Sequence, residues 1–539
     1  MFFDEVIKEY EDKGILKKNT IVDRFLEVAG KYADKKAIYD SEHEITYKEM
    51  ADKILAMGGF LKTQGIDTGD RVLLHINNSI DYAVALLGTM AAGAIPVLLL
   101  QEHRQEEISC IGNEVEAKGY ITVNSGFIKN WKEMTEEVIR NVSGLKVILT
   151  KNANEIITEK KVFSLKDAYS NREYTENLSK YNVEAVFLLS GGTTGKPKII
   201  PKLQEAYLYN IEKCMERSRF DETTVYLTSL SVSHDFALAN PGMLGALLAG
   251  GTVVLPETPF PDDAFEMIEA HRVNTITIVP ALLKAWLDAM EYNENDLSSL
   301  RLVITGAAKI DEKLGNRVEK TFGVKIQNGY GLGEGITCFT SIDDENRIIL
   351  NTQGKPISEY DSIKIIDEDG RELPQGEAGE LTEKGPYTFG GYYKNDELNR
   401  RLFTSDGYFC TGDKAMLDDA GNLVILGRVR EQINRAGENV IPSEVESLLR
   451  RCTGIIDAAV FGEEDEKLGE KTVAALIAEK EKSRKEIAEE ITLMGGAVYK
   501  IPDEIFYLDK FPYKNIGKVD KKELYRLYQK ERKAKNGKD

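Results

Sequence analysis

The chain has 539 residues, of which 42% are hydrophobic and 29% are charged, a composition that excludes a disordered protein and supplies a sizeable core. This length exceeds what a single hydrophobic core usually spans, so we expect a large domain and at least one smaller one. The formal net charge of -19 repels phosphate backbones and anionic lipid surfaces, so we expect neither nucleic acid nor a membrane as a partner.

The cysteines and the first residues indicate a cytoplasmic location. The chain starts with acidic side chains at Asp4 and Glu5 in place of the basic start and long apolar stretch of a signal peptide. The longest apolar run, residues 83–100, is interrupted by glycine and proline, so it predicts a buried helix, a turn and a strand and no membrane span. Neither a disulfide framework nor a zinc site is predicted, because no C-x-x-C pair occurs among the cysteines, which are Cys110, Cys214, Cys338, Cys410 and Cys452.

The first two thirds of the chain alternate apolar runs of strand length with helical periods. Residues 71–76 read as a strand, residues 81–90 as a helix, and residues 94–100 as a second strand. This alternation predicts βαβ units and an α/β fold. It recurs in apolar runs beside amphipathic stretches, at residues 251–255, 262–271, 274–279, 300–306 and 311–322.

The pattern changes twice towards the C-terminus. From about residue 364, short strands are separated by turn pairs such as Asp406-Gly407, which predicts a β-rich subdomain. After Gly427 a compact α+β module is expected, with helices at 443 and 485–494 and strands at 458–462, 472–478 and 504–508. We therefore predict a large N-terminal domain of residues 1–428 and a small mobile C-terminal domain of residues 429–539.

A glycine-rich loop follows an apolar strand at residues 189–202, with the sequence LSGGTTGKPKIIPK. Glycines let backbone N–H groups approach phosphate oxygens, while threonine hydroxyls and the charge of Lys196 or Lys198 add further donors. The pattern favours a phosphate-binding loop over a flexible surface loop. A Walker A loop is disfavoured, because only three residues separate Gly191 from Gly195 and Pro197 stands where a serine or threonine would coordinate magnesium.

Four more sequence signatures follow in order. They are NGYGLGE at 328–334, YFCTGD at 408–413, GRVREQINRAGENVIPSEVE at 427–446, and KNIGKVDK at 514–521. Together with the glycine-rich loop, they resemble the signatures of the adenylate-forming superfamily, which includes acyl-CoA synthetases, luciferases and nonribosomal peptide adenylation domains. The resemblance implies an ATP-dependent ligase that makes an acyl-adenylate and then passes the acyl group to a thiol.

The resemblance also implies a binding site for ATP and Mg²⁺. The phosphates would contact the loop, Asp413 would hold the ribose hydroxyls, and Tyr330 and the turn at residues 306–308 would flank the adenine. Glu334 and Thr194 would hold the metal, which agrees with the preference of a hard cation for oxygen ligands. The residues matched to nucleotide binding are Ser190, Gly191, Gly192, Thr193, Thr194, Gly195, Lys198, Gly306, Ala307, Gly329, Tyr330, Gly331, Asp413 and Arg428.

Lys518, His234 and Glu334 match the catalytic positions of the superfamily. The attacking carboxylate and the α-phosphate are both anionic, so a cation such as Lys518 between them lowers the barrier. Arg430 matches the hinge about which the small domain rotates, although many relatives carry Asp or Lys there. Rotation would withdraw Lys518 and bring the loop at 435–438 towards the acyl-adenylate.

Among subfamilies, the chain looks most like the stand-alone aryl-acid ligases of siderophore pathways, of the 2,3-dihydroxybenzoate-activating type. Supporting stretches include NPGMLGALLAGGTVVL at 240–255 and NTQGKPISEYD at 351–361. His234 would lie against the substrate carboxylate or its adenylate. Cys338 is expected to be a packed wall residue, because nothing cationic adjoins it in sequence. The residues matched to the acyl pocket are Asp235, Phe236, Asn240, Ile278, Gly306, Gly329, Thr337 and Cys338.

Asp235 departs from the dihydroxybenzoate type, which carries asparagine at this position. An ionised carboxylate only accepts hydrogen bonds, and its burial without a partner is costly. In amino-acid-activating relatives an aspartate here binds the α-ammonium group, so Asp235 points towards an amino-bearing acid. The alternative is a donor-rich pocket, in which Asp235 accepts from a ring hydroxyl or from a protein group.

The acyl acceptor and the wider class stay open at this point. The thiol would belong to a phosphopantetheinyl carrier protein or to coenzyme A. A carrier would come in trans, because the chain ends about twenty residues after Lys518, too few for another domain. Amino-acid adenylation, a luciferase-type oxygenase and an inactive nucleotide-binding scaffold are the other hypotheses.

Overall fold

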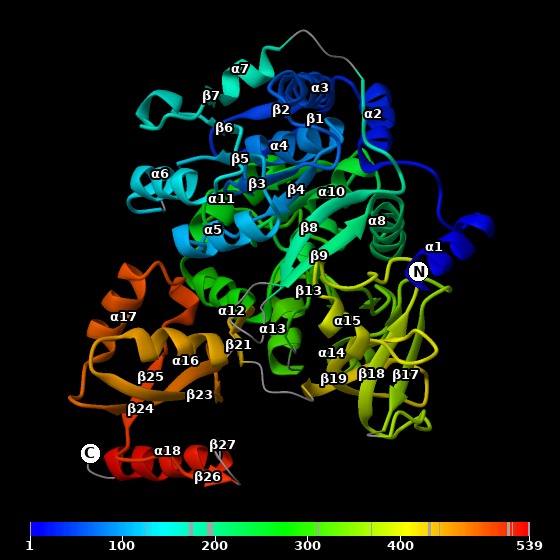
Figure 1. Cartoon of the computed structure of the whole chain (residues 1–539). Coiled ribbons are helices and arrows are strands. Elements are labelled where there is room, and N and C mark those ends of the chain that lie inside the picture. The colour runs from blue at the N-terminus through cyan, green and yellow to red at the C-terminus, as the bar shows by residue number, and fades with distance from the viewer. Residues whose placement is uncertain are drawn as a thin grey trace. The chain divides into compact units, whose positions relative to one another are not determined.

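The computed structural model divides into two compact units (Figure 1). The first comprises the chain up to residue 101 and residues 111–190 and 198–429, and the second comprises residues 102–110 and the chain after 429. The boundary predicted after residue 428 borders residues 429–432, which the structure does not describe, and it stays a prediction. The described residues are 2–124, 126, 128–171, 176–190, 198–308, 310, 312–367, 369–428, 433–440, 442–514, 518–519 and 521–536.

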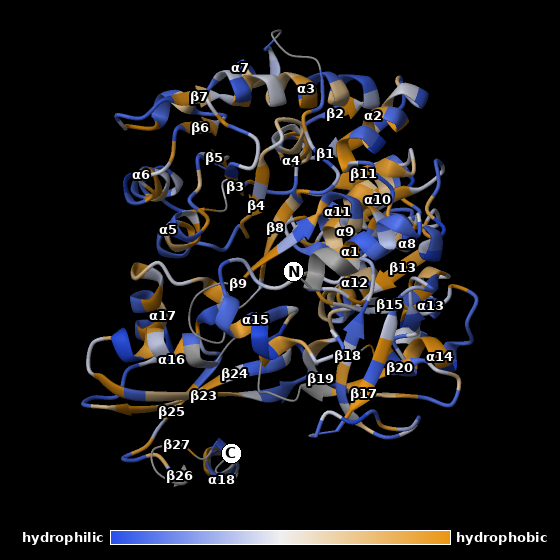
Figure 2. Cartoon of the chain, turned by 45° about the vertical axis from the view of Figure 1, so that its right-hand side comes forward, coloured by the Kyte–Doolittle hydropathy of each residue, from blue (hydrophilic) through white to orange (hydrophobic). Residues whose placement is uncertain are grey.

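A largely parallel sheet of seven described strands forms one part of the first unit, in the order β7-β6-β5-β3-β4-β8-β9. Only β9 is antiparallel to its neighbour, because it returns from β8 in a hairpin. Apolar residues fill these strands, and Figure 2 shows β8 largely in the hydrophobic colour. The strands are β3 (Arg71–His75), β4 (Ile95–Leu98), β5 (Gly119–Thr122), β6 (Val147–Thr150), β7 (Val162–Ser164), β8 (Glu184–Ser190) and β9 (Lys198–Leu203).

A second sheet, with nine described strands, runs in the order β16-β15-β14-β13-β12-β10-β11-β1-β2. Its inner strands are parallel, and β2, β15 and β16 pair antiparallel at its ends. The carboxyl ends of parallel strands meet at one edge, so the turns after β10, β12, β13 and β14 are neighbours. The strands are β1 (Lys36–Asp40), β2 (Glu44–Thr46), β10 (Val225–Thr228), β11 (Thr252–Leu255), β12 (Thr275–Thr277), β13 (Leu302–Thr305), β14 (Lys325–Gly331), β15 (Thr337–Phe339) and β16 (Lys355–Pro356).

Helices connect the parallel strands, as the βαβ prediction requires, and polar caps fix where several of them start. Thr46 and Glu49 form a capping box at α3, and the Ser79 hydroxyl accepts from the backbone N–H of Tyr82 at α4. The helices that begin in this unit are α1 (Phe2–Asp12), α2 (Ile21–Lys31), α3 (Tyr47–Thr63), α4 (Ile80–Ala91), α6 (Trp131–Asn141), α7 (Leu165–Tyr169), α8 (Gln204–Ser218), α9 (Asp235–Ala239), α10 (Gly242–Leu248), α11 (Pro261–His271), α12 (Pro280–Ala289), α13 (Glu312–Phe322), α14 (Asn346–Asn351) and α15 (Asp396–Leu402). Helix α5 (Gln105–Glu114) begins in residues 102–110, which belong to the second unit, and ends in the first unit.

The predicted β-rich subdomain is a four-stranded antiparallel sheet within the described residues, in the order β17-β18-β19-β20. Its strands are β17 (Ser362–Ile366), β18 (Gly379–Lys384), β19 (Phe409–Leu417) and β20 (Leu423–Arg428). The side chains of Ile365, Leu381 and Leu423 pack with Cys338 of β15 in a small hydrophobic cluster. This cluster joins the subdomain to the edge of the nine-stranded sheet.

The second unit confirms the expected α+β module. Alternate residues of a strand face opposite sides of the sheet, so Val460 packs towards α16 and α17, whereas Phe461 packs towards α18. A short hairpin joins β21 to β22 through Ala436 and Gly437, both at positive φ. The elements are β21 (Ile433–Arg435), β22 (Glu438–Val440), α16 (Pro442–Arg451), β23 (Ile455–Asp465), β24 (Gly469–Ala478), α17 (Arg484–Leu493), β25 (Glu504–Tyr507), β26 (Tyr513–Lys514), β27 (Lys518–Val519) and α18 (Lys521–Asn536).

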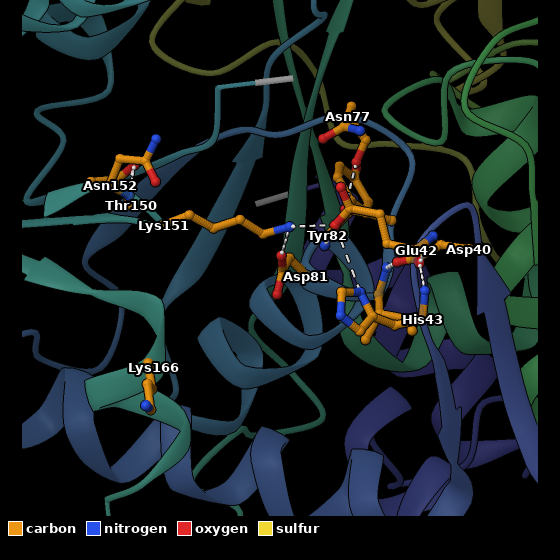
Figure 3. A network of polar contacts seen from close by, with 12 residues as sticks. Asp40, Glu42, His43, Asn77, Asp81, Tyr82, Thr150, Lys151, Asn152 and Lys166 are labelled. Carbon is orange, nitrogen blue, oxygen red and sulfur yellow. Dashed lines mark hydrogen bonds and ion pairs between the residues drawn. The ribbon is translucent and has the colours of Figure 1, made fainter. Parts of the chain in front are cut away.

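A polar network at the surface of the first unit connects four strand and helix ends, and Figure 3 shows part of it. Lys151 Nζ, just after β6, lies 2.9 Å from Asp81 Oδ2 in the first turn of α4. Asp81 Oδ1 accepts a 2.6 Å hydrogen bond from the hydroxyl of Tyr169. Asp40 at the end of β1 accepts from the backbone N–H of Ile80 at 3.0 Å. These contacts connect β6, α4, α7 and β1 at one place on the first unit.

No helix among the described residues is both long enough and apolar enough to cross a membrane.

Candidate active site

The glycine-rich loop begins and ends on two strands that pair with each other. Ser190 ends β8 and lies opposite Lys198, the first residue of β9. The predicted phosphate ligands Gly191, Gly192, Thr193, Thr194 and Gly195 lie outside the described residues. The hairpin nevertheless fixes both ends of the loop at one point of the seven-stranded sheet. Lys198 Nζ lies 4.7 Å from the centre of the Tyr392 ring, a distance suited to a cation–π contact.

Glu334 follows β14 in a tight turn and is 8% exposed. The hydroxyl of Tyr392 donates a 2.6 Å hydrogen bond to Glu334 Oε1, which fixes the orientation of the carboxylate. Tyr392 therefore contacts Lys198 through its ring and Glu334 through its hydroxyl. A single oriented carboxylate suits Mg²⁺, which proteins usually hold through one or two carboxylates together with substrate phosphates and waters. The donor set thus fits the ion, and Thr194, the other predicted ligand, lies outside the described residues.

Tyr330 and Asp413, predicted to bind adenine and ribose, come together although they lie on different sheets. The hydroxyl of Tyr330 donates a 2.5 Å hydrogen bond to Asp413 Oδ2. Asp413 is 4% exposed in β19, directly opposite Arg428 of β20. The side chain of Arg428 is not described. Both residues carry the groups that adenosine needs, an aromatic ring and a carboxylate acceptor.

The turn after β13 is built for close backbone contact. A side chain on Gly306 would place its Cβ 2.8 Å from the carbonyl oxygen of Gly329 and 3.3 Å from Phe236 Cζ. A Cβ on Gly329 would lie 2.3 Å from the Phe339 ring. Ala307 follows with a φ of 61°, in the left-handed region that residues other than glycine rarely adopt. Such strained backbone conformations persist only where the surrounding contacts hold them, and they are concentrated at ligand-binding and active sites.

Asp235, in the first turn of α9, has a donor on each carboxylate oxygen. The hydroxyl of Tyr207 in α8 donates to Oδ1 at 2.5 Å, and Asn240 Nδ2 donates to Oδ2 at 2.9 Å. Burial raises the pKa of Asp235, whereas the charge of Lys202 and these two hydrogen bonds act to lower that pKa. The sequence leaves two alternatives for Asp235, an amino-bearing substrate or a pocket rich in donors. The structure shows two protein donors on the carboxylate, as the second alternative expects.

The Asp235 network continues through two further side chains. Asn210 Nδ2 donates to Asn240 Oδ1 at 2.7 Å, and the Thr337 hydroxyl donates to Asn210 Oδ1 at 3.3 Å. Five residues of the predicted pocket are thus in one place. Phe236 packs against the turn at Gly306, and Asn240 and Thr337 connect to Asp235. His234 is partly exposed and precedes α9 as its N-cap residue.

Two predicted pocket residues do not join this network. Cys338 is adjacent to Thr337 in a strand, so its side chain faces the other side and lies in the cluster with Leu381 and Leu423. Burial raises the pKa of its thiol well above the usual range, which makes it a poor nucleophile, as expected of a wall residue. Ile278 is fully buried in the core between the nine-stranded sheet and its helices. Gly331, which was matched to nucleotide binding and not to the pocket, is exposed at the end of β14.

The second unit contains the predicted adenylation lysine. Lys518 begins β27 and pairs with Lys514 of β26, but its side chain is not described. The predicted hinge residue Arg430 lies outside the described residues. Arg435 is held by two hydrogen bonds of 2.7 Å to the carboxylate of Asp503. This anchors the β21–β22 hairpin, which the sequence associates with the second reaction.

Four residues of the site were not predicted. Tyr207 and Asn210 in α8 hold the Asp235 network, Tyr392 orients Glu334, and Lys202 is a buried lysine in β9 that is 3% exposed. Lys202 is the last residue of the glycine-rich signature and lies in a strand. A lysine at a buried strand position is unusual, and this could have identified it from the sequence. The tyrosines and Asn210 carry no comparable signal, because polar residues on amphipathic segments are common.

Comparisons with known proteins identify the family of this chain. The model of the AMP-binding enzyme family matches residues 25–393, and that of the AMP-binding enzyme C-terminal domain matches residues 444–518. The chain therefore belongs to the family of AMP-binding enzymes.

Relatives match the chain over almost its whole length. The 2,3-dihydroxybenzoate-AMP ligase of Bacillus subtilis is 36% identical and covers 97% of this chain and 96% of its own. Pyochelin synthase PchD of Pseudomonas aeruginosa is also 36% identical, over 96% of this chain and 94% of its own. The apo structure of Mycobacterium smegmatis MbtA is 32% identical with a TM-score of 0.73 and covers 97% of both chains. The amide bond synthetase McbA of Marinactinospora thermotolerans, at 22% identity, has the same fold with a TM-score of 0.82 over 95% of this chain and all of its own.

Proposed function

We propose that the chain is an AMP-forming aryl-acid ligase, which activates an aromatic carboxylic acid with ATP and passes the acyl group to a phosphopantetheine thiol. Family membership and the full-length likeness to a 2,3-dihydroxybenzoate-AMP ligase support the proposal. The observation that carries it is the arrangement at one edge of the nine-stranded sheet. There Asp235, Gly306 and Glu334 come after β10, β13 and β14, three of the four consecutive strands β14-β13-β12-β10, and we assign to them the acid pocket, the nucleotide turn and the metal carboxylate.

In the first half-reaction, a carboxylate oxygen of the acid attacks the α-phosphorus of ATP and pyrophosphate leaves. Tyr330 and Asp413 hold the adenine and the ribose. His234 lies against the acid carboxylate, and the Lys518 ammonium offsets the charge of the carboxylate and the phosphates as they approach. Mg²⁺, when bound by Glu334 and Thr194, supplies further positive charge beside the phosphates.

In the second half-reaction, the thiol sulfur attacks the acyl carbon, the thioester forms and AMP leaves. The small domain turns about Arg430 between the two reactions and withdraws Lys518. A carrier protein is the proposed thiol donor, because one relative is named a pyochelin synthase and another is named component E of enterobactin synthase, a name that implies partner proteins. The location we propose is the cytoplasm, and all five cysteines are free thiols.

The acid is proposed to be a benzoate that bears a hydroxyl or an amino group. Asp235 has a donor from the protein on each oxygen, yet a carboxylate offers about four acceptor sites. The remaining sites can accept from a ring hydroxyl or amine. The Phe236 ring packs at Gly306 and supplies an apolar surface beside Asp235 on which a substrate ring can lie.

The proposal is tested with ATP–pyrophosphate exchange across benzoates and α-amino acids, followed by thioester formation with a carrier protein or coenzyme A. Exchange with hydroxy- or aminobenzoates and acyl transfer to the carrier support the proposal. Exchange with α-amino acids alone would assign amino-acid adenylation, and transfer to coenzyme A alone would assign an aryl-CoA synthetase.

A further inference from the structure

Lys202 is a buried lysine whose ammonium lies between the acid pocket and the metal carboxylate. Its Nζ donates to the carbonyl oxygens of Gly333 at 3.0 Å and of Tyr387 at 3.1 Å. Gly333 directly precedes Glu334, so Lys202 also holds the turn that carries this carboxylate. These contacts fix the ammonium in place, since a lysine has only three donors.

On its other side, Lys202 interacts with Asp235 across one aromatic ring. Its Nζ lies 5.7 Å from the centre of the Tyr207 ring, within cation–π range, and the hydroxyl of the same ring donates to Asp235 Oδ1. Burial lowers the pKa of Lys202, and the charges of Asp235, Glu383 and Glu334 act to raise that pKa. Lysine and aspartate therefore stabilise each other's charged form.

We propose that Lys202 is a specificity-determining residue, which supplies the countercharge of Asp235 so that the pocket takes aryl acids with a neutral donor, a hydroxyl or an aniline-type amine. This inference rests on the proposed function. A buried carboxylate without a cation needs one from its ligand. Lys202 already meets that need, so an ammonium group on the substrate brings a second positive charge beside Lys202. Substrates with an unprotonated hydroxyl or amine donate to Asp235 without this repulsion.

The test compares the full-length wild type with Lys202→Met, which keeps the length of the side chain and removes its charge, and with Lys202→Arg, which keeps the charge. Pyrophosphate exchange is measured with 2- and 3-hydroxybenzoate, 2- and 3-aminobenzoate, and the matching aminomethylbenzoates, whose amines are protonated at neutral pH. Lys213→Met is the matched control, because Lys213 Nζ lies 5.8 Å from the centre of the Tyr209 ring but pairs with the surface Glu216.

We expect the wild type to prefer the neutral donors, and Lys202→Met to shift the ratio of kcat/KM between neutral and cationic acids by about tenfold or more towards the cationic ones. The change should appear in KM for the acid. Lys202→Arg keeps the charge, so it should keep the wild-type preference for neutral donors. Lys213→Met should also leave this preference unchanged. In an Asp235→Asn background the effect of Lys202→Met should shrink, as coupled residues require.

Parallel losses with all acids in Lys202→Met, without a change in the ratio, would overturn the inference and leave Lys202 a structural residue. A wild type that prefers the aminomethylbenzoates would overturn it as well. Neither result affects the proposed function, because in both of them the wild type still exchanges with an aryl acid. Thermal unfolding of each variant shows whether it still folds. Because the ratio of kcat/KM between two acids is measured on the same enzyme sample, it does not depend on how much of that sample is folded.

Discussion

Tyr207 and Asp235 lie 28 positions apart in the sequence, yet the tyrosine hydroxyl donates a 2.5 Å hydrogen bond to the aspartate Oδ1. Burial raises the pKa of Asp235, and this hydrogen bond opposes that rise by stabilising the charged form. The pair therefore keeps an acceptor available where the substrate ring is proposed to bind.

Tyr207→Phe should raise the pKa of Asp235, because the charged carboxylate loses a donor while its burial remains. If the ionised form accepts the substrate donor, the acid limb of the kcat/KM profile for a hydroxybenzoate should move to higher pH in the variant. A pH series of pyrophosphate exchange measures this. An unchanged acid limb would show that Asp235 does not act as the acceptor.

Tyr392→Phe removes the hydroxyl that orients Glu334 and leaves the ring that contacts Lys198. The apparent Mg²⁺ requirement of exchange should rise by about tenfold, the usual scale for losing a group that orients a metal ligand. The KM for the acid should change little. Tyr393→Phe is the control, since the ring of Tyr393 packs on Phe187 at 4.9 Å between centroids. Equal effects of the two variants would contradict the role given to Tyr392.

Gly306→Ala should destabilise the first unit, because its Cβ would lie 2.8 Å from the Gly329 carbonyl oxygen. Overpacking of this kind costs about 1–3 kcal/mol and should lower the thermal midpoint together with exchange activity. Gly331→Ala is the matched control for stability, since its Cβ would have its nearest neighbour at 3.5 Å. A Gly306→Ala protein as stable as Gly331→Ala would mean that the turn has more room than the structure shows.

Glu383 links stability to pH. Burial raises its pKa from an ordinary value of 4.5 to about 8, partly opposed by a hydrogen bond from Thr388. Between these values the folded protein keeps a proton that the unfolded chain releases, so stability falls as pH rises, by at most about 1.4 kcal/mol per pH unit.

Glu383→Gln removes this proton linkage. Its stability relative to the wild type should therefore increase from about pH 5 to about pH 8, as measured by thermal unfolding across that range. Glu372→Gln, at an exposed position near the same sheet, should not change the dependence. A wild-type minus Glu383→Gln difference that stays constant with pH would contradict the raised pKa.

The sequence predicted the scaffold better than the contacts of the site. The apolar run at 71–76 and the helical period at 81–90 correspond to β3 and α4, because strand and helix periods are local properties of the chain. The motifs assign Tyr330 and Asp413 to the predicted nucleotide site, and the structure joins the two side chains by a hydrogen bond.

The rest depends on packing between segments that are distant in the sequence. Tyr392 reaches Glu334 across 58 positions, and nothing local distinguishes that tyrosine from its neighbour Tyr393. The sequence match assigns both Cys338 and Thr337 to the pocket, but adjacent strand residues face opposite sides, so only Thr337 reaches the Asp235 network. Side-chain direction at such positions follows from the register of β14 and β15.

The central claim, adenylation of an aryl acid, is tested most directly by pyrophosphate exchange with hydroxy- and aminobenzoates in the wild type and in Lys518→Ala. We predict exchange with at least one of these acids in the wild type. In Lys518→Ala exchange should fall by about a hundredfold or more, as expected for loss of a charge that stabilises the transition state, while thioester formation from a supplied acyl-adenylate continues. Absence of exchange with every benzoate in the wild type, or unchanged exchange in Lys518→Ala, would contradict the account.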